Sequence, residues 1–184
     1  MRYHNNFVLI RVIRGQNFLF LKKNRNFVQN FWNMNDKQNL LDRRYLAMAR
    51  IWGQNSYCLR RKVGALLVKD KMIISDGYNG TPSGFENICE DDNQVTKPYV
   101  LHAEANAITK VAKSNNSSEG STLYVTASPC LECAKLIIQS GIRRVVYGEM
   151  YRIDDGIRLL QRAGIEVKYV ECDELTISDG IEKQ

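Results

Sequence analysis

Strand-like and helix-like segments alternate through the second half of the sequence, and this alternation restricts the folds that the chain can adopt. Three short segments rich in Val and Tyr are typical of strands, and two amphipathic segments between them, each followed by a glycine, are typical of helices. In chain order they are a strand at 122–126, a helix at 129–140, a strand at 143–147, a helix at 154–163 and a strand at 166–170. Strands separated by single helices pair in parallel through right-handed crossovers. The pattern therefore predicts a parallel sheet covered by helices.

The sequence before this region adds two helices and a hairpin. Apolar residues at spacings of three and four predict a helix over 38–53. Strands at 63–68 and 72–76, separated by a three-residue turn, form the hairpin, and a further helix covers 103–113. The loop at 77–101 is long for a compact domain, which is typical of a functional loop. Together these elements predict an α/β fold, a three-layer α/β/α domain with a mixed five-stranded sheet.

The net charge of +6 is concentrated in the first 33 residues. This segment has six basic residues and no acidic one, so the remainder carries 20 Lys and Arg against 20 Asp and Glu. A neutral body does not fit a nucleic-acid-binding protein, which needs a basic surface. No apolar run reaches the roughly 18 residues that a membrane span requires. We therefore expect neither a nucleic acid nor a membrane as partner.

Residues 1–33 also differ from the rest in composition, with seven asparagines and short apolar clusters broken by arginine. They match a secretory signal and a transit peptide poorly. Met34 is followed by a sequence of ordinary globular composition, and we interpret it as the biological start. The expected organisation is an extension without chemistry at 1–33, one domain at 34–175 and a polar tail at 176–184.

An odd cysteine count of five, without a secretory signal, is typical of a protein from the reducing cytoplasm, where thiols stay free. Cys130 and Cys133 form a Cys-x-x-Cys pair directly after Ser128 and Pro129. Serine as the N-cap and proline at the first helical position predict that a helix begins here. The helix dipole then favours thiolates in the first turn, the form that a soft metal needs.

A histidine and a glutamate lie upstream of this pair, at the predicted start of a helix. His102 is the only histidine after the first 33 residues, and Glu104 follows it by two positions. His-x-Glu followed by Pro-Cys-x-x-Cys is the signature of zinc deaminases. The imidazole of His102 and the thiolates of Cys130 and Cys133 supply three ligands for Zn²⁺. A fourth position is left for water, as in catalytic zinc sites.

This ligand set predicts a hydrolytic deamination. Zinc lowers the pKa of a bound water from 15.7 towards about 7, so hydroxide is available at neutral pH. We expect Glu104 to take a proton from this water, deliver it to ring nitrogen N3 and protonate the departing amino group. Attack at C4 of a cytosine ring then gives uracil and ammonia. Outside this motif, His102 would be interpreted as a structural residue and Glu104 as an exposed acid stabilised by the helix dipole.

Beyond the zinc motif, the sequence resembles the zinc-dependent deoxycytidylate (dCMP) deaminases of the cytidine deaminase-like superfamily over about residues 40–170. The zinc motif is common to the superfamily, whereas the loop Gly-Tyr-Asn-Gly-x-Pro-x-Gly points to the dCMP deaminases. The matching segments are Arg61-Lys62-Val63-Gly64-Ala65, the loop from Gly77 to Gly84, the helix start from His102 to Ile108, and Thr126 to Lys135.

The resemblance implies that the protein converts dCMP to dUMP and ammonia, which supplies dUMP for thymidylate synthesis. It also implies a homo-oligomer, a homohexamer, with dCTP as activator and dTTP as inhibitor. In this family the Gly-Tyr-Asn-Gly loop serves substrate and effector binding, which suggests Asn79, and Tyr151 matches a tyrosine that packs against the base. Arg60, Arg61 and Lys62 are candidate phosphate ligands by their position. Asn79 could equally serve the geometry of its turn, and basic residues beside a strand are mostly solvated.

A second, structural zinc is also considered, because some relatives carry one on cysteines at places similar to Cys58 and Cys89. Those sites are completed by a histidine that this chain lacks, so buried free thiols are the default expectation. Two other functions stay open. One is a deaminase of another cytosine nucleoside, base or related ring, and the other is a non-catalytic zinc-stabilised module, which would not need Glu104.

Overall fold

The computed structural model describes residues 7–11, 18–22, 25–151 and 153–171, with side chains from residue 36 onward. The chain divides into two compact units, residues 1–41 and 42–184. The predicted polar tail at 176–184 lies outside the described residues, as does the predicted domain end at residue 175.

The first unit contains a hairpin and the beginning of a long helix. Strands β1 (Phe7–Arg11) and β2 (Phe18–Lys22) pair antiparallel. Helix α1 (Arg25–Gly53) starts here and continues into the second unit. The sequence patterns indicated no helix or strand within residues 1–33, whereas the structure has β1, β2 and the beginning of α1 there. Helix α1 begins at Arg25, 13 positions before the expected residue 38. The two short apolar clusters of this segment pair with each other as β1 and β2.

A five-stranded sheet in the order β4-β3-β5-β6-β7 forms the centre of the second unit. Strand β3 pairs antiparallel with both β4 and β5, whereas β5, β6 and β7 run parallel. This confirms the predicted mixed sheet. The strands are β3 (Gly64–Lys69), β4 (Met72–Tyr78), β5 (Thr122–Val125), β6 (Arg144–Tyr147) and β7 (Glu166–Tyr169).

Three shorter helices connect the strands, and their bounds agree with the predicted ones to within two residues. They are α2 (Ala103–Ala112), α3 (Leu131–Gln139) and α4 (Asp155–Arg162). Gly141 and Gly164 follow α3 and α4 with φ of 75° and 77°, a backbone conformation that glycine adopts without strain. None of the described helices combines the length and the apolar character that crossing a bilayer takes.

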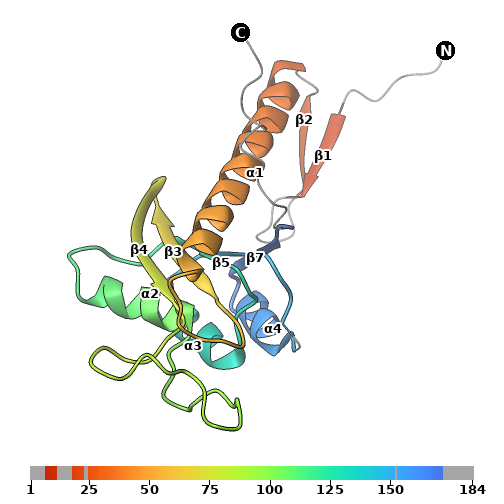
Figure 1. Ribbon diagram of the computed structural model, residues 1–184. Coiled ribbons are helices and arrows are strands. Elements are labelled where there is room, and N and C mark those ends of the chain that lie inside the picture. The colour runs from red at the N-terminus through yellow and green to blue at the C-terminus, as the bar shows by residue number, and fades with distance from the viewer. Residues whose placement is uncertain (1–6, 12–17, 23–24, 152, 172–184) are drawn as a thin grey trace, which may run out of the picture. The chain divides into compact units, whose positions relative to one another are not determined.

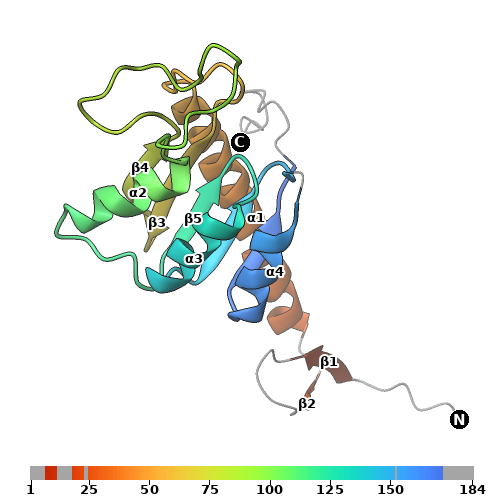
Figure 2. The same cartoon turned by 90° about the horizontal axis from the view of Figure 1, so that it is seen from below.

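The two faces of the sheet carry two apolar layers, because alternate side chains of a strand point to opposite faces. On one face Leu66 packs with Leu46 and Ala49 of α1. On the other face Leu67 and Leu123 pack with side chains of α2, α3 and α4. Figures 1 and 2 show these three helices on the side of the sheet opposite the C-terminal part of α1. The predicted three-layer arrangement is therefore confirmed.

Asp42 fixes the C-terminal part of α1 to the sheet. Its side chain is fully buried, and its two oxygens accept hydrogen bonds from Arg144 Nη1 and Nη2 at 2.8 and 2.7 Å. Lys168 Nζ donates at 2.8 Å and the hydroxyl of Tyr124 at 2.9 Å. A carboxylate is stable away from water only with such partners, so this cluster determines where α1 packs.

Candidate active site and metal centre

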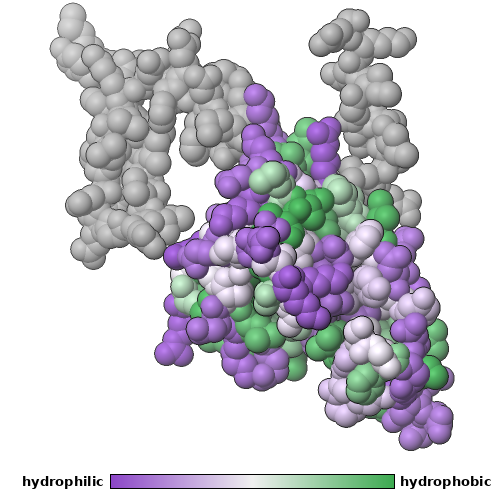
Figure 3. All heavy atoms as spheres, turned by 90° about the vertical axis from the view of Figure 1, so that its left-hand side faces the viewer, coloured by the Kyte–Doolittle hydropathy of each residue, from purple (hydrophilic) through white to green (hydrophobic). Residues whose placement is uncertain are grey.

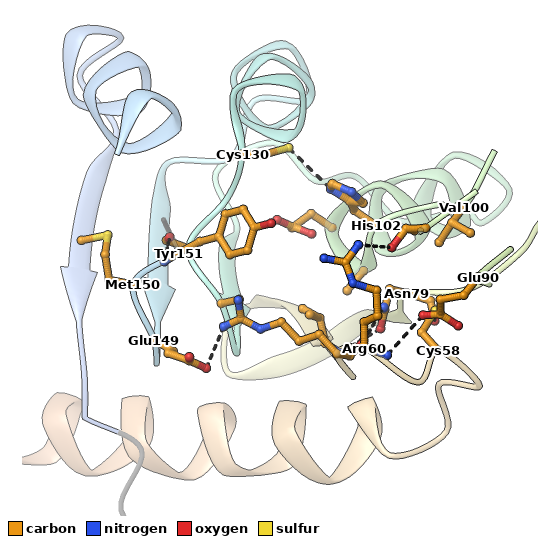
Figure 4. A pocket seen from close by; sticks show the side chains of 17 residues that line it. Cys58, Arg60, Asn79, Glu90, Val100, His102, Cys130, Glu149, Met150 and Tyr151 are labelled. Carbon is orange, nitrogen blue, oxygen red and sulfur yellow. Dashed lines mark hydrogen bonds and ion pairs between the residues drawn. The ribbon is translucent and has the colours of Figure 1, made fainter. Parts of the chain in front are cut away.

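A cavity of about 410 Å³ is lined by residues that follow the parallel strands β5 and β6, which is where α/β sheets commonly bind ligands. Figure 4 shows the side chains that line it. Further lining comes from the segment before β3, from the loop between β4 and α2, and from the start of α2. The 17 lining residues are Cys58, Arg60, Arg61, Val63, Asn79, Glu90, Thr96, Val100, His102, Ala103, Glu104, Ala127, Ser128, Cys130, Glu149, Met150 and Tyr151.

His102, Cys130 and Cys133 meet at one end of the cavity, as the sequence predicted. Their ligand atoms lie within 4.8 Å of one another. His102 Nδ1 is 3.5 Å from Cys130 Sγ and 3.4 Å from Cys133 Sγ. His102 is the N-cap of α2 and Cys130 the N-cap of α3. His102 precedes Cys130 by 28 residues and Cys133 by 31, and the starts of two helices bring the three side chains together.

The donor set fits a zinc ion. Zinc bonds are about 2.3 Å long to sulfur and 2.0–2.1 Å to nitrogen, so tetrahedral angles place a sulfur and a nitrogen ligand about 3.5 Å apart. The distances from His102 Nδ1 to the two sulfurs match this spacing. Hydrogen bonds from Cys133 and His102 lower the pKa of Cys130 from 9.0 to about 3. The hydrogen bond to Cys130, together with burial, raises the pKa of Cys133. Metal binding requires both cysteines as thiolates, so it would release the protons that they carry.

Glu104 lies on α2 beside this group and lines the same cavity. Only 4% of the residue is exposed, and burial raises the pKa of its carboxyl group. The alternative interpretation, an exposed acid in a first helical turn, is therefore wrong. A buried carboxyl group that faces a cavity is suited to taking up and releasing a proton.

Ser128 holds the segment after β6 in place. Its backbone N–H donates to the backbone oxygen of Glu149 at 2.8 Å, and its hydroxyl accepts from the backbone N–H of Tyr151 at 2.7 Å. The prediction that Ser128 caps α3 is wrong, because the cap position belongs to Cys130 and the hydroxyl is used by Tyr151. Nothing in the local sequence indicates this contact, since the two residues are 23 positions apart.

Arg60 and Arg61 lie in the segment before β3 and line the cavity. Arg61 Nη2 lies 2.7 Å from Glu149 Oε2, and its guanidinium carbon is 5.3 Å from the centre of the Tyr151 ring. Nη2 is shielded from solvent and, among the described residues, has no acceptor in hydrogen-bond geometry. Arg60 and Arg61 line the cavity as predicted, whereas Lys62 does not and donates to the backbone oxygen of Gln54 at 3.3 Å.

Asn79 connects the glycine-rich loop to the arginine segment. Its Nδ2 donates to the backbone oxygen of Arg61 at 2.8 Å, and its Oδ1 accepts from the backbone N–H of Val63 at 2.8 Å. The side chain thus fixes the backbone around Arg61, in addition to lining the cavity. Gly77 of the same motif lies against α2, where an added Cβ would overlap the backbone oxygen of Ala103.

Cys58 and Cys89 form a disulfide across 31 residues, with a Cα–Cα distance of 5.1 Å. The expectation that both thiols stay free is therefore wrong. The second zinc considered on these residues also fails, because sulfurs bonded to each other are not thiolate ligands. The two cysteines come together because the loop after β4 folds back onto the segment before β3. A pairing of this kind between distant residues is not visible in the sequence pattern.

Glu90, next to Cys89, is a lining residue that sequence reasoning did not assign to the site. It is 8% exposed. Its Oε1 accepts from the backbone N–H groups of Leu59 and Arg60 at 3.1 and 3.2 Å. No sequence signal marks it, because the residues it contacts are about 30 positions away and offer only backbone atoms.

Comparison with known proteins agrees with this geometry. The family model for the cytidine and deoxycytidylate deaminase zinc-binding region matches residues 38–149. ComE operon protein 2 of Bacillus subtilis (strain 168) is 35% identical over 137 residues, which are 72% of this chain and 72% of that protein. The deoxycytidylate deaminase of enterobacteria phage T4 is 38% identical over 168 residues, covering 66% of this chain and 86% of the phage enzyme.

Among solved structures, the dCMP deaminase of cyanophage S-TIM5 in complex with dCMP and dUMP is 50% identical and superposes with a TM-score of 0.67. The superposition covers 68% of this chain and 93% of the cyanophage chain. With a family model that matches more than half of the sequence, and with His102, Cys130 and the buried Glu104 in one cavity, the chain belongs to the cytidine and deoxycytidylate deaminase family with a zinc-binding region.

Proposed function

We propose that the protein hydrolyses dCMP to dUMP and ammonia in this cavity. The observation that carries the proposal is the position of Glu104, a buried carboxyl group that shares one cavity with the candidate metal ligands His102 and Cys130 and with two arginines. A deaminase needs a proton-transfer group beside its metal, and a nucleotide substrate needs cations for its phosphate. Relatives named deoxycytidylate deaminase, one of them solved with dCMP and dUMP, support the choice of substrate.

Glu104 handles the protons of the reaction. A zinc ion held by His102, Cys130 and Cys133 supplies an activated water molecule. Glu104 accepts a proton as a carboxylate, passes it to N3 of the cytosine ring and then protonates the leaving amino group. Its raised pKa favours this role, because a general acid–base is most effective when its pKa approaches the working pH. The C4–O bond forms before the C4–N bond breaks, and the proton for the leaving amino group comes from the hydroxyl then bound to C4, so dCMP and water become dUMP and ammonia.

Tyr151 holds the base. Its side chain points into the cavity from the connection between β6 and α4 (Figure 4). Through Ser128 its backbone is fixed to the turn that carries Cys130. The cytosine ring packs against the phenol ring, since offset and edge-to-face contacts between rings are favourable. This contact presents C4 to the metal end of the cavity.

Arg61 binds the 5′-phosphate. Its Nη2 lies 2.7 Å from Glu149 Oε2 but outside hydrogen-bond geometry, so a phosphate oxygen can supply the well-oriented charged acceptor that this atom lacks. The ion pair with Glu149 does not prevent this, because the Glu149 side chain is 70% exposed and exposed pairs contribute little. Arg60 lies on the same wall and adds a second cation.

The two alternative functions account for less of the site. A non-catalytic zinc module has no use for a buried glutamate that faces a cavity beside the metal ligands. A deaminase of bases or nucleosides has no use for two arginines in the cavity wall. A substrate with both a cytosine ring and a phosphate uses all of these groups.

A substrate panel tests the proposal. The purified protein is incubated with dCMP, CMP, deoxycytidine and cytosine, and ammonia release is followed. We expect kcat/KM for dCMP to exceed that for deoxycytidine by a factor of up to about 10⁴, because a site built for a phosphate leaves buried polar groups unpaired when the phosphate is missing. Preference over CMP is expected from the family resemblance alone. Equal values for dCMP and deoxycytidine would contradict phosphate recognition.

Glu104→Gln tests the proton-transfer role. The variant should keep its zinc and lose about 10²- to 10⁴-fold in kcat for dCMP. Zinc content is measured by elemental analysis on the same sample that is assayed. Wild-type turnover in a zinc-loaded variant would show that another group moves the protons.

The family resemblance further supports a homo-oligomer, a homohexamer, with dCTP as activator and dTTP as inhibitor. Figure 3 shows apolar patches on one face, and large apolar side chains such as Ile51 and Leu59 are exposed, a feature common at subunit contacts. Light scattering with and without dCTP, combined with rate measurements in dCTP and dTTP, tests this. A monomer whose rate is the same with either nucleotide would contradict it.

A further inference from the structure

Glu90 is a buried carboxylate that the reaction does not use. It lies in the loop between β4 and α2 and is 8% exposed. Oε1 accepts from the backbone N–H groups of Leu59 and Arg60 at 3.1 and 3.2 Å, and Oε2 accepts from Leu59 at 3.2 Å. Within the described part of the chain, no lysine or arginine forms an ion pair with it. Its contacts therefore hold the backbone at Arg60.

A second contact from the same loop holds the Arg60 side chain. Thr96 Oγ1 accepts from Arg60 Nη1 at 3.3 Å. Glu90 and Thr96 face each other across an antiparallel bridge, and the backbone N–H of Lys97 donates to the oxygen of Cys89 at 2.8 Å. This closed part of the loop, residues 89–97, thus contacts both the backbone and the guanidinium group of Arg60.

The arginine segment depends on these contacts for its position. Residues 59–63 belong to no helix or strand, so no ladder of backbone hydrogen bonds fixes them. Asn79 holds the end of the segment near Val63, and the Cys58–Cys89 disulfide and Glu90 hold its beginning. Without the Glu90 carboxylate, the N–H groups of Leu59 and Arg60 lose their acceptor. A shift of about 1 Å in a substrate-positioning group is enough to lower a rate about 10²-fold.

We propose that Glu90 is a positioning residue. It sets how far the two arginines, Arg60 and Arg61, lie from the reaction centre, and thereby determines the preference for a substrate with a 5′-phosphate. The inference rests on the proposed function, in which these arginines bind that phosphate. Glu90 does not touch the substrate and acts through the backbone at Leu59 and Arg60. Its loss therefore affects the phosphate contact and leaves the chemistry at C4 intact.

The test compares Glu90→Ala and Glu90→Gln with Asp92→Asn, which changes an exposed acidic residue of the same loop that does not line the cavity. For each protein, kcat and KM are measured with dCMP and with deoxycytidine, together with zinc content and Tm. We expect Glu90→Ala to raise the KM for dCMP at least about 10-fold while kcat/KM for deoxycytidine changes less than about 2-fold. Glu90→Gln keeps one carbonyl acceptor and should restore part of the dCMP preference. Asp92→Asn should match the wild type.

Two results would overturn the inference while the proposed function stands. One is an unchanged preference for dCMP in both Glu90 variants. The other is an equal loss with both substrates accompanied by a lower Tm, which is the result of a purely structural role. If Glu90→Ala does not fold, Glu90→Gln decides alone, because its side chain has the same shape and removes only the charge and one acceptor. A wild-type protein that treats dCMP and deoxycytidine alike would instead overturn phosphate recognition itself, and this inference with it.

Discussion

Arg144 places both of its Nη atoms on the carboxylate of Asp42, at 2.8 and 2.7 Å, across 102 residues of sequence. The pair joins helix α1 to strand β6 in the interior of the second unit, where Asp42 has no contact with solvent. Lys168 and Tyr124 also donate to the same carboxylate. The position of α1 on the sheet therefore depends on one acidic side chain.

We expect Asp42→Asn to destabilise the protein by about 3–5 kcal/mol, because removing one partner of a buried ion pair leaves the other charges uncompensated. The free energy of unfolding is measured by urea denaturation. Asp36→Asn, an exposed aspartate on the same helix, is the matched control and should change stability by less than about 0.5 kcal/mol. A loss below 1 kcal/mol in Asp42→Asn would show that the cluster contributes little.

Purified protein should contain about one tightly bound zinc per chain, since one imidazole and two sulfurs at tetrahedral donor spacing form a single site. His102→Ala and Cys130→Ala each remove a ligand and should lose the metal and all deaminase activity. Elemental analysis measures the zinc. Cys172→Ala is the control, because it changes a cysteine that is not one of the proposed ligands, and this variant should keep its zinc. Full zinc occupancy in either ligand variant would disprove the assignment.

The disulfide between Cys58 and Cys89 predicts how many thiols react. Unfolded, zinc-free protein should take up three alkyl groups without reductant and five with it, because two of the five cysteines are bonded to each other. Intact-mass measurement counts the groups. Five groups in both samples would restore the free-thiol expectation. A zinc content near two that falls to one in Cys58→Ser would restore the second metal.

A chain that begins at Met34 should fold and deaminate dCMP with the kcat/KM of the full chain. All residues that line the cavity are retained, as are Asp42, Leu46 and Ala49, which pack α1 against the sheet. Rates are compared with those of the full chain, and circular dichroism checks the fold. Insoluble or inactive protein would show that residues 1–33, with their two strands and the first turns of α1, are needed.

The sequence by itself determined the sheet, its covering helices and the reaction centre. Apolar periodicity places the elements between residues 63 and 170, because core burial imposes a period of two on strands and near 3.6 on helices. His102, Glu104, Cys130 and Cys133 are equally visible, since metal binding restricts the residue types and two short motifs contain all four. Each of these features is encoded within a few neighbouring residues.

The tertiary structure decided which side chains meet across long stretches of sequence. Ser128 contacts Tyr151, Glu90 contacts Leu59 and Arg60, and Cys58 pairs with Cys89. It also separated Arg61, which lines the cavity, from the adjacent Lys62, which does not. Residues 59–63 form neither a helix nor a strand, so no regular period in the sequence says which of their side chains meet the cavity. Only the folded chain brings these distant groups within hydrogen-bond distance, and there the long loop positions the arginines that we propose to bind the phosphate.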